Sequence, residues 1–423
     1  MIRFTYLFFL AGKSAWNRRG TLLLVVLSIA LSTTLLLGLE RVRTQVRESF
    51  VQAVSGVDLV VGARGGDMQL MLYAVFHLGG ATNNMSWKSA LSIAARPDVA
   101  WSVPISLGDS HNGYPVVGTS ADFFTRYRFR GGRELQLAQG GSFSDLFDVV
   151  TGSEVAKKHG YVPGSRIILS HGNSGAQLAR HEDKPFVVSG VLRPTGTPVD
   201  RSLYISLEAM EAIHLNWQGG APIRGLEIRP DQVRKFNLEP KSITALLVGM
   251  KSRSRVFALQ QDIRNWKEEA LTGVMPGVAM DQIWRLVSTG EQALFLVSGL
   301  VIFTGLAGLA SAILAGLGER RRELAILRSA GARPLDILIL LACEGFLLLC
   351  AGMACGLLLL VLLLLALGPT LADSYGIALH VSPPGTGELL LLGGIAAAGF
   401  LTCLIPAWRA YRLSLADGLT AST

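Results

Sequence analysis

Four long apolar stretches constrain this chain more than any other feature of its sequence. Each has at least 20 residues and at most two charged side chains, and they are residues 20–39, 293–317, 335–368 and 389–410. Because about 20 consecutive apolar residues suffice to cross the hydrocarbon core of a bilayer, the sequence predicts four membrane-spanning helices. All four stretches are also longer than the apolar segment of a signal peptide.

Charge and composition narrow the class of protein further. The chain has 423 residues, a formal net charge of +8 and a pI near 9.5, yet only 17% of its residues are charged and its mean hydropathy is +0.41. Soluble domains carry about 25% charged residues. This combination excludes a disordered chain and a small disulfide-rich protein. It favours a membrane protein over a nucleic-acid-binding one, so no nucleic-acid partner is expected.

The distribution of Lys and Arg around the spans predicts their orientation. Basic residues cluster before the first span, between the second and third spans, and after the fourth, whereas residues 369–388 contain none. Because cytoplasmic loops are enriched in Lys and Arg, both termini and the segment 318–334 are expected in the cytoplasm. The long segment 42–288 is then expected outside.

The spans and the orientation together give an expected organisation of the chain. In order, it comprises a cytoplasmic or interfacial N-terminal helix (1–19), the first span (20–41), the outside domain with stalk helices (42–288), the second span (289–317), a cytoplasmic helix (318–334), the third span (335–368), a short outside loop (369–388), the fourth span (389–410) and a cytoplasmic tail (411–423).

The outside domain is expected to mix helices and strands. All four cysteines lie in predicted spans, so this domain cannot rely on disulfides and must be stabilised by its own core. A β-branched run predicts a strand over 57–62, and Asn112-Gly113 between apolar runs predicts a hairpin. A helix is expected over 86–95, with Ser86 or Asn84 as its cap. The amphipathic segment 254–269 is expected to form the helical stalk that returns to the membrane.

Several separated motifs together resemble the permeases of the MacB/FtsX superfamily of ABC transporters, which includes LolC-like and LolE-like members. These motifs are residues 17–21, 319–332 and 406–413 around the spans, and residues 131–133, 150–156, 160–165 and 188–192 in the outside domain. The resemblance implies a membrane α-helical protein with four transmembrane helices and a large periplasmic α+β domain, the MacB-like core domain, inserted between helices 1 and 2. It also implies a multi-pass protein of the inner membrane.

The basic segment between the second and third spans carries a second expectation. Its charged and apolar side chains can dock onto another protein, although the positive-inside rule alone also explains its arginines. The resemblance implies that this is the coupling helix that contacts an ATPase. The residues expected to take part are Glu319, Arg320, Arg321, Arg322, Glu323, Leu324, Ile326, Leu327 and Arg328.

The ATPase is expected to be a separate chain. The sequence contains no G-x-x-x-x-G-K-[ST] phosphate-binding loop, so ATP and Mg are assigned to the partner subunit and no cofactor is expected in this chain. The resemblance further implies a second permease copy, as a homodimer or alternatively a heterodimer. In the second span, Gly305, Gly308 and Ala312 are expected to form the dimer surface, with packing against lipid as the alternative.

Three further groups of residues are candidates for function. Glu344 is a carboxylate within an apolar stretch, which indicates either a structural pairing with an arginine or a role in transmitting motion. Segment 64–78 is rich in Met and aromatic residues. It is expected either to contact cargo or a periplasmic partner, or to form a helix packed into the domain core. The candidate contact residues are Met68, Leu70, Met71, Tyr73, Phe76 and, further along, Trp87. The seven histidines show no metal-binding spacing, so no metal site and no catalytic residue is expected.

The expected function is that of a non-catalytic permease subunit. As the resemblance implies, ATP hydrolysis in the partner drives conformational change in the periplasm, either for export or for transport of a lipoprotein or lipophilic substrate. Membrane lipids and a periplasmic protein or lipoprotein are the expected further partners. The alternative is an FtsX-like transmembrane regulator that activates a periplasmic enzyme and transports nothing.

Overall fold

The computed structural model divides the chain into two compact units. It describes residues 19–52, 56–79, 83–129, 131–172, 179–218, 221–223, 228–319, 326, 329, 331–375 and 381–412. The helical unit comprises Met1–Val46 and Ser288–Thr423, and the inserted domain comprises Arg47–Val287. The expected N-terminal helix (1–19) and cytoplasmic tail (411–423) lie almost wholly outside the described residues.

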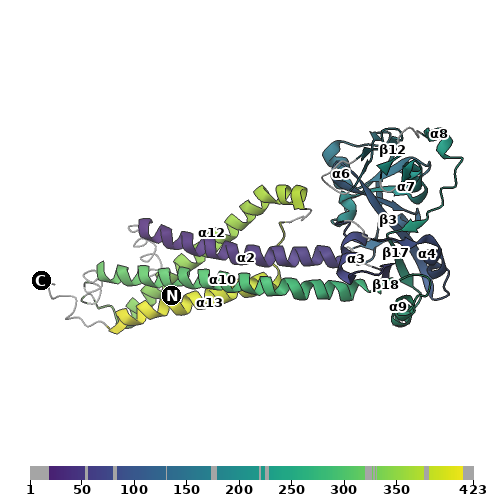
Figure 1. The fold of residues 1–423 in the computed structure, drawn as a ribbon. Helices are drawn as coiled ribbons and strands as arrows, with labels where there is room; N and C mark the ends of the chain where they lie inside the picture. The colour runs from purple at the N-terminus through teal and green to yellow at the C-terminus, as the bar shows by residue number, and fades with distance from the viewer. Residues whose placement is uncertain are drawn as a thin grey trace. The chain divides into compact units, whose positions relative to one another are not determined.

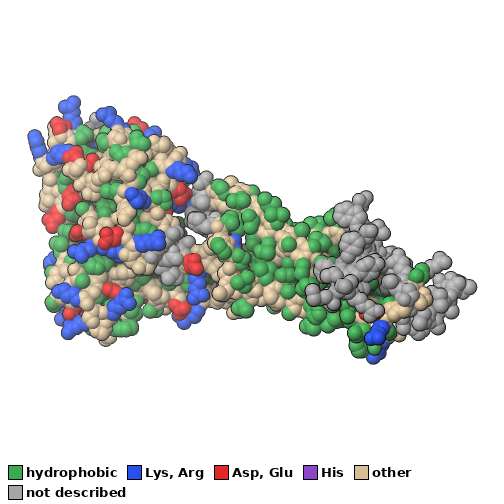
Figure 2. Space-filling view, turned by 180° about the vertical axis from the view of Figure 1, so that it is seen from behind, with side chains coloured by type: hydrophobic (Ala, Val, Ile, Leu, Met, Phe, Trp, Pro, Cys, Tyr) green, Lys and Arg blue, Asp and Glu red, His purple; other side chains and the backbone are tan. Residues whose placement is uncertain are grey.

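Four long helices carry the apolar stretches of the sequence (Figure 1). They are α2 (Arg19–Gln52), α10 (Pro276–Glu319), α12 (Pro334–Tyr375) and α13 (Thr386–Arg412). Each contains a segment that is long and apolar enough to cross a membrane. Figure 2 shows apolar side chains covering these helices, whereas the inserted domain carries most of the charged ones. The predicted membrane protein with four spans is therefore confirmed.

Small residues let these helices pack closely. A Cβ at Gly352 of α12 would meet the side chain of Ile29 of α2, and one at Gly399 of α13 would meet Leu349 of α12. Leu309 of α10 and Leu349 are completely buried in the same apolar cluster. Close backbone approach at small residues is the usual way in which membrane helices associate, because lipid offers no hydrophobic driving force.

The inserted domain is built around one mixed sheet. Its strands follow the order β18-β1-β17-β3-β4-β13-β8-β12-β7. Their bounds are β1 Leu59–Ala63, β3 Val99–His111, β4 Tyr114–Thr119, β7 Leu137–Gly140, β8 Asp148–Thr151, β12 Phe186–Leu192, β13 Leu203–Ser206, β17 Ala245–Met250 and β18 Leu271–Val274. The β4–β13 and β8–β12 pairs are parallel and the others along this path are antiparallel. The predicted α+β class of this domain is confirmed.

Alternation along the strands divides the apolar side chains between the two faces of the sheet. In β1, Val60 joins one core, whereas Leu59 and Val61 join another. Tyr204 of β13 likewise lies in the first core, while Leu203 and Ile205 belong to a third. Successive side chains of a strand point to opposite faces, so both faces of this sheet are covered by apolar layers.

Helices cap and cover this sheet. They are α3 (Asp67–Ala74), α4 (Trp87–Ala94), α6 (Ser153–His159), α7 (Leu207–His214) and α9 (Val256–Arg264). The Ser86 side chain accepts a hydrogen bond from the Ser89 backbone N–H, and Ser206 does the same for Ala209. Such N-caps satisfy backbone donors that have no partner within the helix. The predicted helix is confirmed, and it begins at Trp87, directly after its N-cap Ser86.

The return to the membrane differs from the prediction. Segment 254–269 was expected to be the stalk, but it contains only the nine-residue helix α9, and the edge strand β18 follows it. The long helix α10 begins later, at Pro276. The physical reason is that Leu271–Val274 completes the sheet by pairing with β1, so the chain cannot leave the domain before that strand.

A hairpin joins β3 and β4. Asn112 and Gly113 have φ angles of 50° and 84°. Positive φ at both central residues is what a type I′ turn requires, and Asn-Gly is its preferred sequence. The pairing of β3 with β4 shifts register between Leu107 and Asp109. A bulge of this kind bends the strand and redirects the side chains next to it.

Candidate functional site

The expected coupling segment lies mostly outside the described residues. Glu319 ends helix α10, and Ile326 is described and exposed. The other expected coupling residues, which fall on undescribed positions, are Arg320, Arg321, Arg322, Glu323, Leu324, Leu327 and Arg328. Their role remains a prediction.

The glycine surface expected to join two permease copies is used within one chain instead. A Cβ at Gly305 would meet the hydroxyl groups of Ser32 and Ser28 of α2. Ala312 packs against the apolar cluster of the helical unit. These two residues therefore serve helix packing inside the chain, because α2 approaches α10 at this point. Gly308 faces open space and stays a candidate for contact with another copy.

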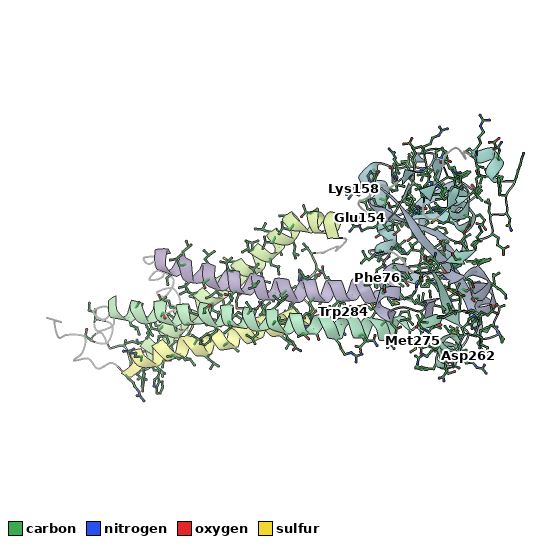
Figure 3. The ribbon with its side chains drawn as sticks, viewed as in Figure 1. Phe76, Glu154, Lys158, Asp262, Met275 and Trp284 are labelled. Atoms are coloured by element: carbon green, nitrogen blue, oxygen red, sulfur yellow. The ribbon has the colours of Figure 1, made fainter. Side chains whose placement is uncertain are left out.

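The structure favours packing over cargo contact for the Met-rich and aromatic segment. Leu70, Met71, Tyr73 and Phe76 are at most 5% exposed and belong to one core of the inserted domain. Figure 3 labels Phe76 beside the other side chains of this domain. Buried side chains cannot present a surface to a partner, so the prediction of a contact site is corrected for these four. The remaining two, Met68 and Trp87, are half-buried.

The carboxylate of Glu344 is buried within helix α12, where it is 6% exposed. Burial of a carboxylate among apolar helices is consistent with a structural pairing and with a role in transmitting motion, and neither is tested by this placement.

Helices α2, α10 and α13 share a network of ion pairs that the sequence did not reveal. The Arg41 guanidinium donates two hydrogen bonds to the Glu388 carboxylate, of 2.7 Å from Nε and 2.6 Å from Nη2. Both side chains are less than a tenth exposed. Arg43 lies 3.2 Å from Glu40 and 3.0 Å from Glu291 of α10. A bidentate pair of this kind fixes the orientation of both side chains as well as joining their charges.

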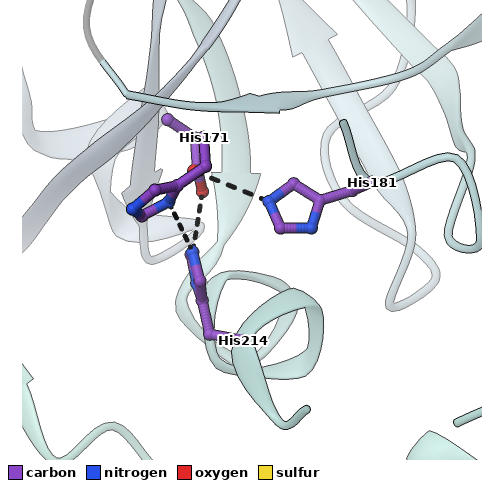
Figure 4. A group of neighbouring side chains, drawn as sticks. His171, His181 and His214 are labelled. Carbon is purple, nitrogen blue, oxygen red and sulfur yellow. Dashed lines mark hydrogen bonds and ion pairs between the residues drawn. The ribbon is translucent and has the colours of Figure 1, made fainter. Parts of the chain in front are cut away.

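A second polar cluster lies in the inserted domain, and four separate elements build it. Asp109 stands on β3 just after the bulge, and His171 lies directly opposite it on β10 (Ser170–His171). His181 comes one residue after β11 (Ala179–Arg180), which pairs with β10. His214 is the last residue of α7. Figure 4 shows the three imidazole rings converging on one point.

The polar atoms of this cluster lie close together. Asp109 Oδ1 is 2.9 Å from His171 Nδ1 and 3.7 Å from His181 Nε2, and Asp109 Oδ2 is 3.5 Å from His214 Nε2. His171 Nδ1 and His214 Nε2 are 3.2 Å apart. One ligand atom from each of the four residues lies within 4.8 Å of all the others. We call these four residues the histidine–aspartate cluster.

Electrostatics within the cluster favour a charged carboxylate. Burial raises the pKa of Asp109, but the three imidazoles of His171, His181 and His214 beside its carboxylate outweigh burial and hold this pKa well below its usual range. Burial lowers the pKa of His214, and the hydrogen bond and negative charge of Asp109 outweigh it and raise this pKa. The site therefore has a fixed negative charge facing three imidazoles.

The expectation of no metal site was argued from spacing, and spacing could not find this cluster. Its members are separated by 62, 10 and 33 positions in the sequence, on three strands or strand ends and one helix. Only His171 and His181 are close in sequence. The remaining signal is that three of the seven histidines fall between residues 171 and 214.

Comparison with known proteins places the chain among permeases. Residues 20–266, more than half of the chain, match the model of the MacB-like periplasmic core domain, and residues 295–415 match the FtsX-like permease C-terminal domain. No curated protein matches the chain. Among solved structures, the periplasmic region of MacB from Actinobacillus actinomycetemcomitans is 13% identical, with a TM-score of 0.34, and the alignment covers 55% of this chain and 95% of that one.

A second solved structure, the extracellular domain of the noncanonic ABC-type transporter YknZ from Gram-positive bacteria, is 11% identical with a TM-score of 0.30. That alignment covers 52% of this chain and 99% of the other. The aligned parts of both relatives lie outside the membrane by their descriptions.

Proposed function

Because this chain belongs to the family of ABC permeases with a MacB-like periplasmic core domain and an FtsX-like C-terminal domain, we propose that it is a transporter subunit that transmits motion. In this proposal, a separate cytoplasmic ATPase hydrolyses ATP and the permease relays the resulting movement to the inserted domain. The chain itself is a non-catalytic component, with ATP and Mg bound by the partner.

The observation that supports this proposal most is the anchoring of helix α10 in two cores. Ala279 and Met280, near its start, are buried in a core of the inserted domain, and Trp284 packs against that core (Figure 3). Leu309 and Ile313, further along the same unbroken helix, are buried in the core of the helical unit.

The length of this helix suits a mechanical role. Its 44 residues extend about 66 Å at 1.5 Å per residue, roughly twice the 30 Å thickness of a hydrocarbon core. We infer that this helix relays a displacement between the two cores, because side chains along it belong to both.

The ion pairs between the helices support coordinated movement. Arg41 joins α2 to α13, and Arg43 joins α2 to α10. A displacement of α2 is therefore opposed by charge pairs to both of the other helices, which favours movement of the three together. Transmission also requires two states of the assembly whose equilibrium ATP shifts.

The proposal includes the orientation and the assembly. The chain would lie in the inner membrane with both termini in the cytoplasm and the inserted domain in the periplasm. Two permease copies, as a homodimer, would assemble with the ATPase subunits. The substrate would be a lipoprotein or another lipophilic molecule handled on the periplasmic side.

An experiment on the purified complex tests this function. The chain and its ATPase are co-expressed, isolated through a tag on the permease and reconstituted in lipid nanodiscs, and ATP hydrolysis is measured. Charge reversal of Arg320, Arg322 and Arg328 to Glu is expected to abolish both copurification of the ATPase and its stimulation by the permease. The matched control Arg253→Glu reverses an arginine that is 89% exposed in the inserted domain and should leave both unchanged.

The outcome also separates transport from regulation. Lipid or lipoprotein that copurifies with the wild-type complex, and leaves on ATP addition, supports transport. A periplasmic hydrolase that copurifies and is activated by ATP supports the FtsX-like alternative. ATPase that binds equally well to the charge-reversed and wild-type chains contradicts the assignment of the coupling segment.

A further inference from the structure

We propose that Asp109, His171, His181 and His214 form a binding site for one divalent transition-metal ion in the inserted domain, with Zn²⁺ as the best-matched ion. The inference concerns the histidine–aspartate cluster alone, so it stands or falls separately from the proposed transport function. Nothing in the membership of the permease family requires such a site.

The distances within the cluster match those around a four-coordinate metal. Zinc–nitrogen bonds of about 2.0–2.1 Å, arranged tetrahedrally, place neighbouring ligand atoms about 3.3 Å apart. In the cluster, three carboxylate–imidazole separations and the separation between the His171 and His214 nitrogens run from 2.9 to 3.7 Å. The largest separation between any two ligand atoms is at most 4.8 Å, so small side-chain rotations close the tetrahedron.

Two buried atoms of the cluster lack hydrogen-bond partners among the residues that the structure describes. They are Oδ2 of Asp109, whose side chain is fully buried, and Nε2 of His181, whose side chain is 1% exposed. A buried polar atom without a partner destabilises a fold, because it has lost its hydrogen bonds to water. Both atoms face the other members of the cluster, and a metal ion placed between them would satisfy both.

The contact between His171 and His214 is arranged as that between two metal ligands would be. The Nδ1–H of His214 donates to the backbone carbonyl oxygen of Met210 at 2.8 Å, so Nε2 is the ring nitrogen directed at the cluster. This is the outer hydrogen bond that metal-binding histidines usually make, and it fixes both the tautomer and the ring orientation.

The surroundings hold the four ligands in place. Ser110 Oγ donates to the Gly172 carbonyl oxygen at 2.6 Å and the Gly172 N–H donates to Gly108 at 3.0 Å, so β3 and the turn after β10 are tied together beside the ligands. The indole of Trp217 lies 4.5 Å from the His171 ring and 5.0 Å from the His181 ring, measured between centroids. The ring contacts restrict rotation of both imidazoles.

The neighbouring positive charge is compensated. The buried ammonium group of Lys184, three residues after His181, lies 2.7 Å from the Asp183 carboxylate and donates a hydrogen bond to Asn216. Its charge is therefore neutralised locally and does not oppose a cation in the cluster.

The chemistry of the ligands selects the ion. Three imidazoles and one carboxylate suit Zn²⁺ and related transition metals, whereas Ca²⁺ and Mg²⁺ prefer all-oxygen sites. Four protein ligands complete a tetrahedron and leave no position for a reacting water, so the site is structural or regulatory. The side chains of His171 and His214 are 24% and 26% exposed, which gives the ion a route from solvent.

The test uses the full-length chain in detergent, purified with a tag that contains no histidine and stripped of metal with a chelator. Zn²⁺ is titrated in competition with a chromophoric chelator, and Co²⁺ is added separately to read the coordination geometry from its visible absorption. The variants are His171→Ala and His214→Gln. The matched control is His159→Ala, which removes a histidine of the same domain from a separate aromatic group with His111 and Tyr161.

The wild-type chain and the control are expected to bind one equivalent of Zn²⁺ and to give the intense visible bands of four-coordinate Co²⁺. The two cluster variants are expected to lose more than about 100-fold in affinity, since even an outer-shell change weakens binding by about 10–100-fold. Circular dichroism of the metal-free proteins establishes that the variants are folded.

Three results would overturn the proposal. One is wild-type protein that binds no stoichiometric Zn²⁺. Another is binding that His171→Ala and His159→Ala weaken equally. The third is a Co²⁺ spectrum of octahedral type, which would indicate an ion held mostly by water. If a variant does not fold, the stoichiometry and the Co²⁺ spectrum of the wild-type chain still decide the question.

Discussion

The buried pair of Arg41 and Glu388 offers a quantitative test of how the helical unit is held together. Two hydrogen bonds of 2.6 and 2.7 Å join side chains that are 5% and 8% exposed. With an effective dielectric constant of about 20, two unit charges about 4 Å apart attract each other by about 4 kcal/mol. Removing one partner leaves the other charge buried and unpaired, which typically destabilises a protein by about 3–5 kcal/mol.

Glu388→Gln should therefore lower the free energy of unfolding of the helical unit by about 3–5 kcal/mol. The double variant, Arg41→Met with Glu388→Leu, should recover most of this loss, because replacing both members of a buried pair by apolar groups is often nearly neutral. The more exposed pair of Arg43 and Glu291, 3.0 Å apart in the same helical unit, provides the comparison. Glu291→Gln should destabilise this unit by less, because the Arg43 side chain is 36% exposed to solvent.

The assay can be made specific for the helical unit. All four cysteines of the chain lie in it, and Cys403 is completely buried. Because Cys350 and Cys355 are exposed and Cys343 is partly exposed, these three are replaced by Ala. A dye that fluoresces on reaction with the remaining thiol of Cys403 then reports the unfolding of this unit during heating or denaturant titration, while the inserted domain stays silent. The reasoning is refuted if Glu388→Gln destabilises no more than Glu291→Gln, or if the double variant loses the sum of the two single losses.

Three further predictions concern the inserted domain. Burial lowers the pKa of His77 from 6.5 to about 4, so the fold favours the neutral ring. The stability that the neutral ring contributes is complete above pH 6.5 and is lost as the pH falls towards 4, and the loss in the free energy of unfolding reaches at most about 3 kcal/mol. His77→Asn, which tolerates the φ of 54°, should flatten this pH dependence in unfolding followed by tryptophan fluorescence, and an unchanged pH dependence would contradict the reasoning. A Cβ at Gly152 would collide with the carbonyl oxygens of Val199 and Asp200, so Gly152→Ala should destabilise the domain by about 1–3 kcal/mol in denaturant titration. Gly141 faces open space, so Gly141→Ala should leave the stability unchanged, and equal effects of the two variants would refute the collision. Free Zn²⁺ at 100 times its dissociation constant should stabilise the domain by about 2.7 kcal/mol, and this gain should vanish in His171→Ala; stabilisation that persists in the variant would place the ion elsewhere.

The sequence correctly predicted those parts of the molecule that depend on local sequence patterns. An apolar run of 20 residues has few alternatives to a membrane span, and Asn112-Gly113 or Ser86 specify a turn and a helix start through their own backbone and side-chain chemistry. The prediction placed the return stalk too early, at 254–269, because helical periodicity carries no information about the later pairing of β18 with β1. That requirement is a long-range one.

The site residues show the same division more sharply. The side chains of Leu70, Met71 and Phe76 look suited to a contact surface by residue type, but only the packed sheet shows that they are buried. Asp109 is brought to His171 by strand pairing and to His214 by the packing of α7, and neither relation has a trace in sequence spacing. Arg41 and Glu388 are 347 positions apart and meet only because α2 and α13 are neighbours.

The central claim, that nucleotide bound by a partner moves the inserted domain, can be measured as a distance. The four cysteines are replaced by Ala, and one cysteine is placed at Phe257, which is 67% exposed on α9, to carry a spin label in each permease copy. Distances between the two labels are recorded by electron double resonance for the complete complex in nanodiscs, with ADP and with a trapped ATP state. The account predicts two different distance distributions, whereas identical distributions in a complex that hydrolyses ATP would contradict it.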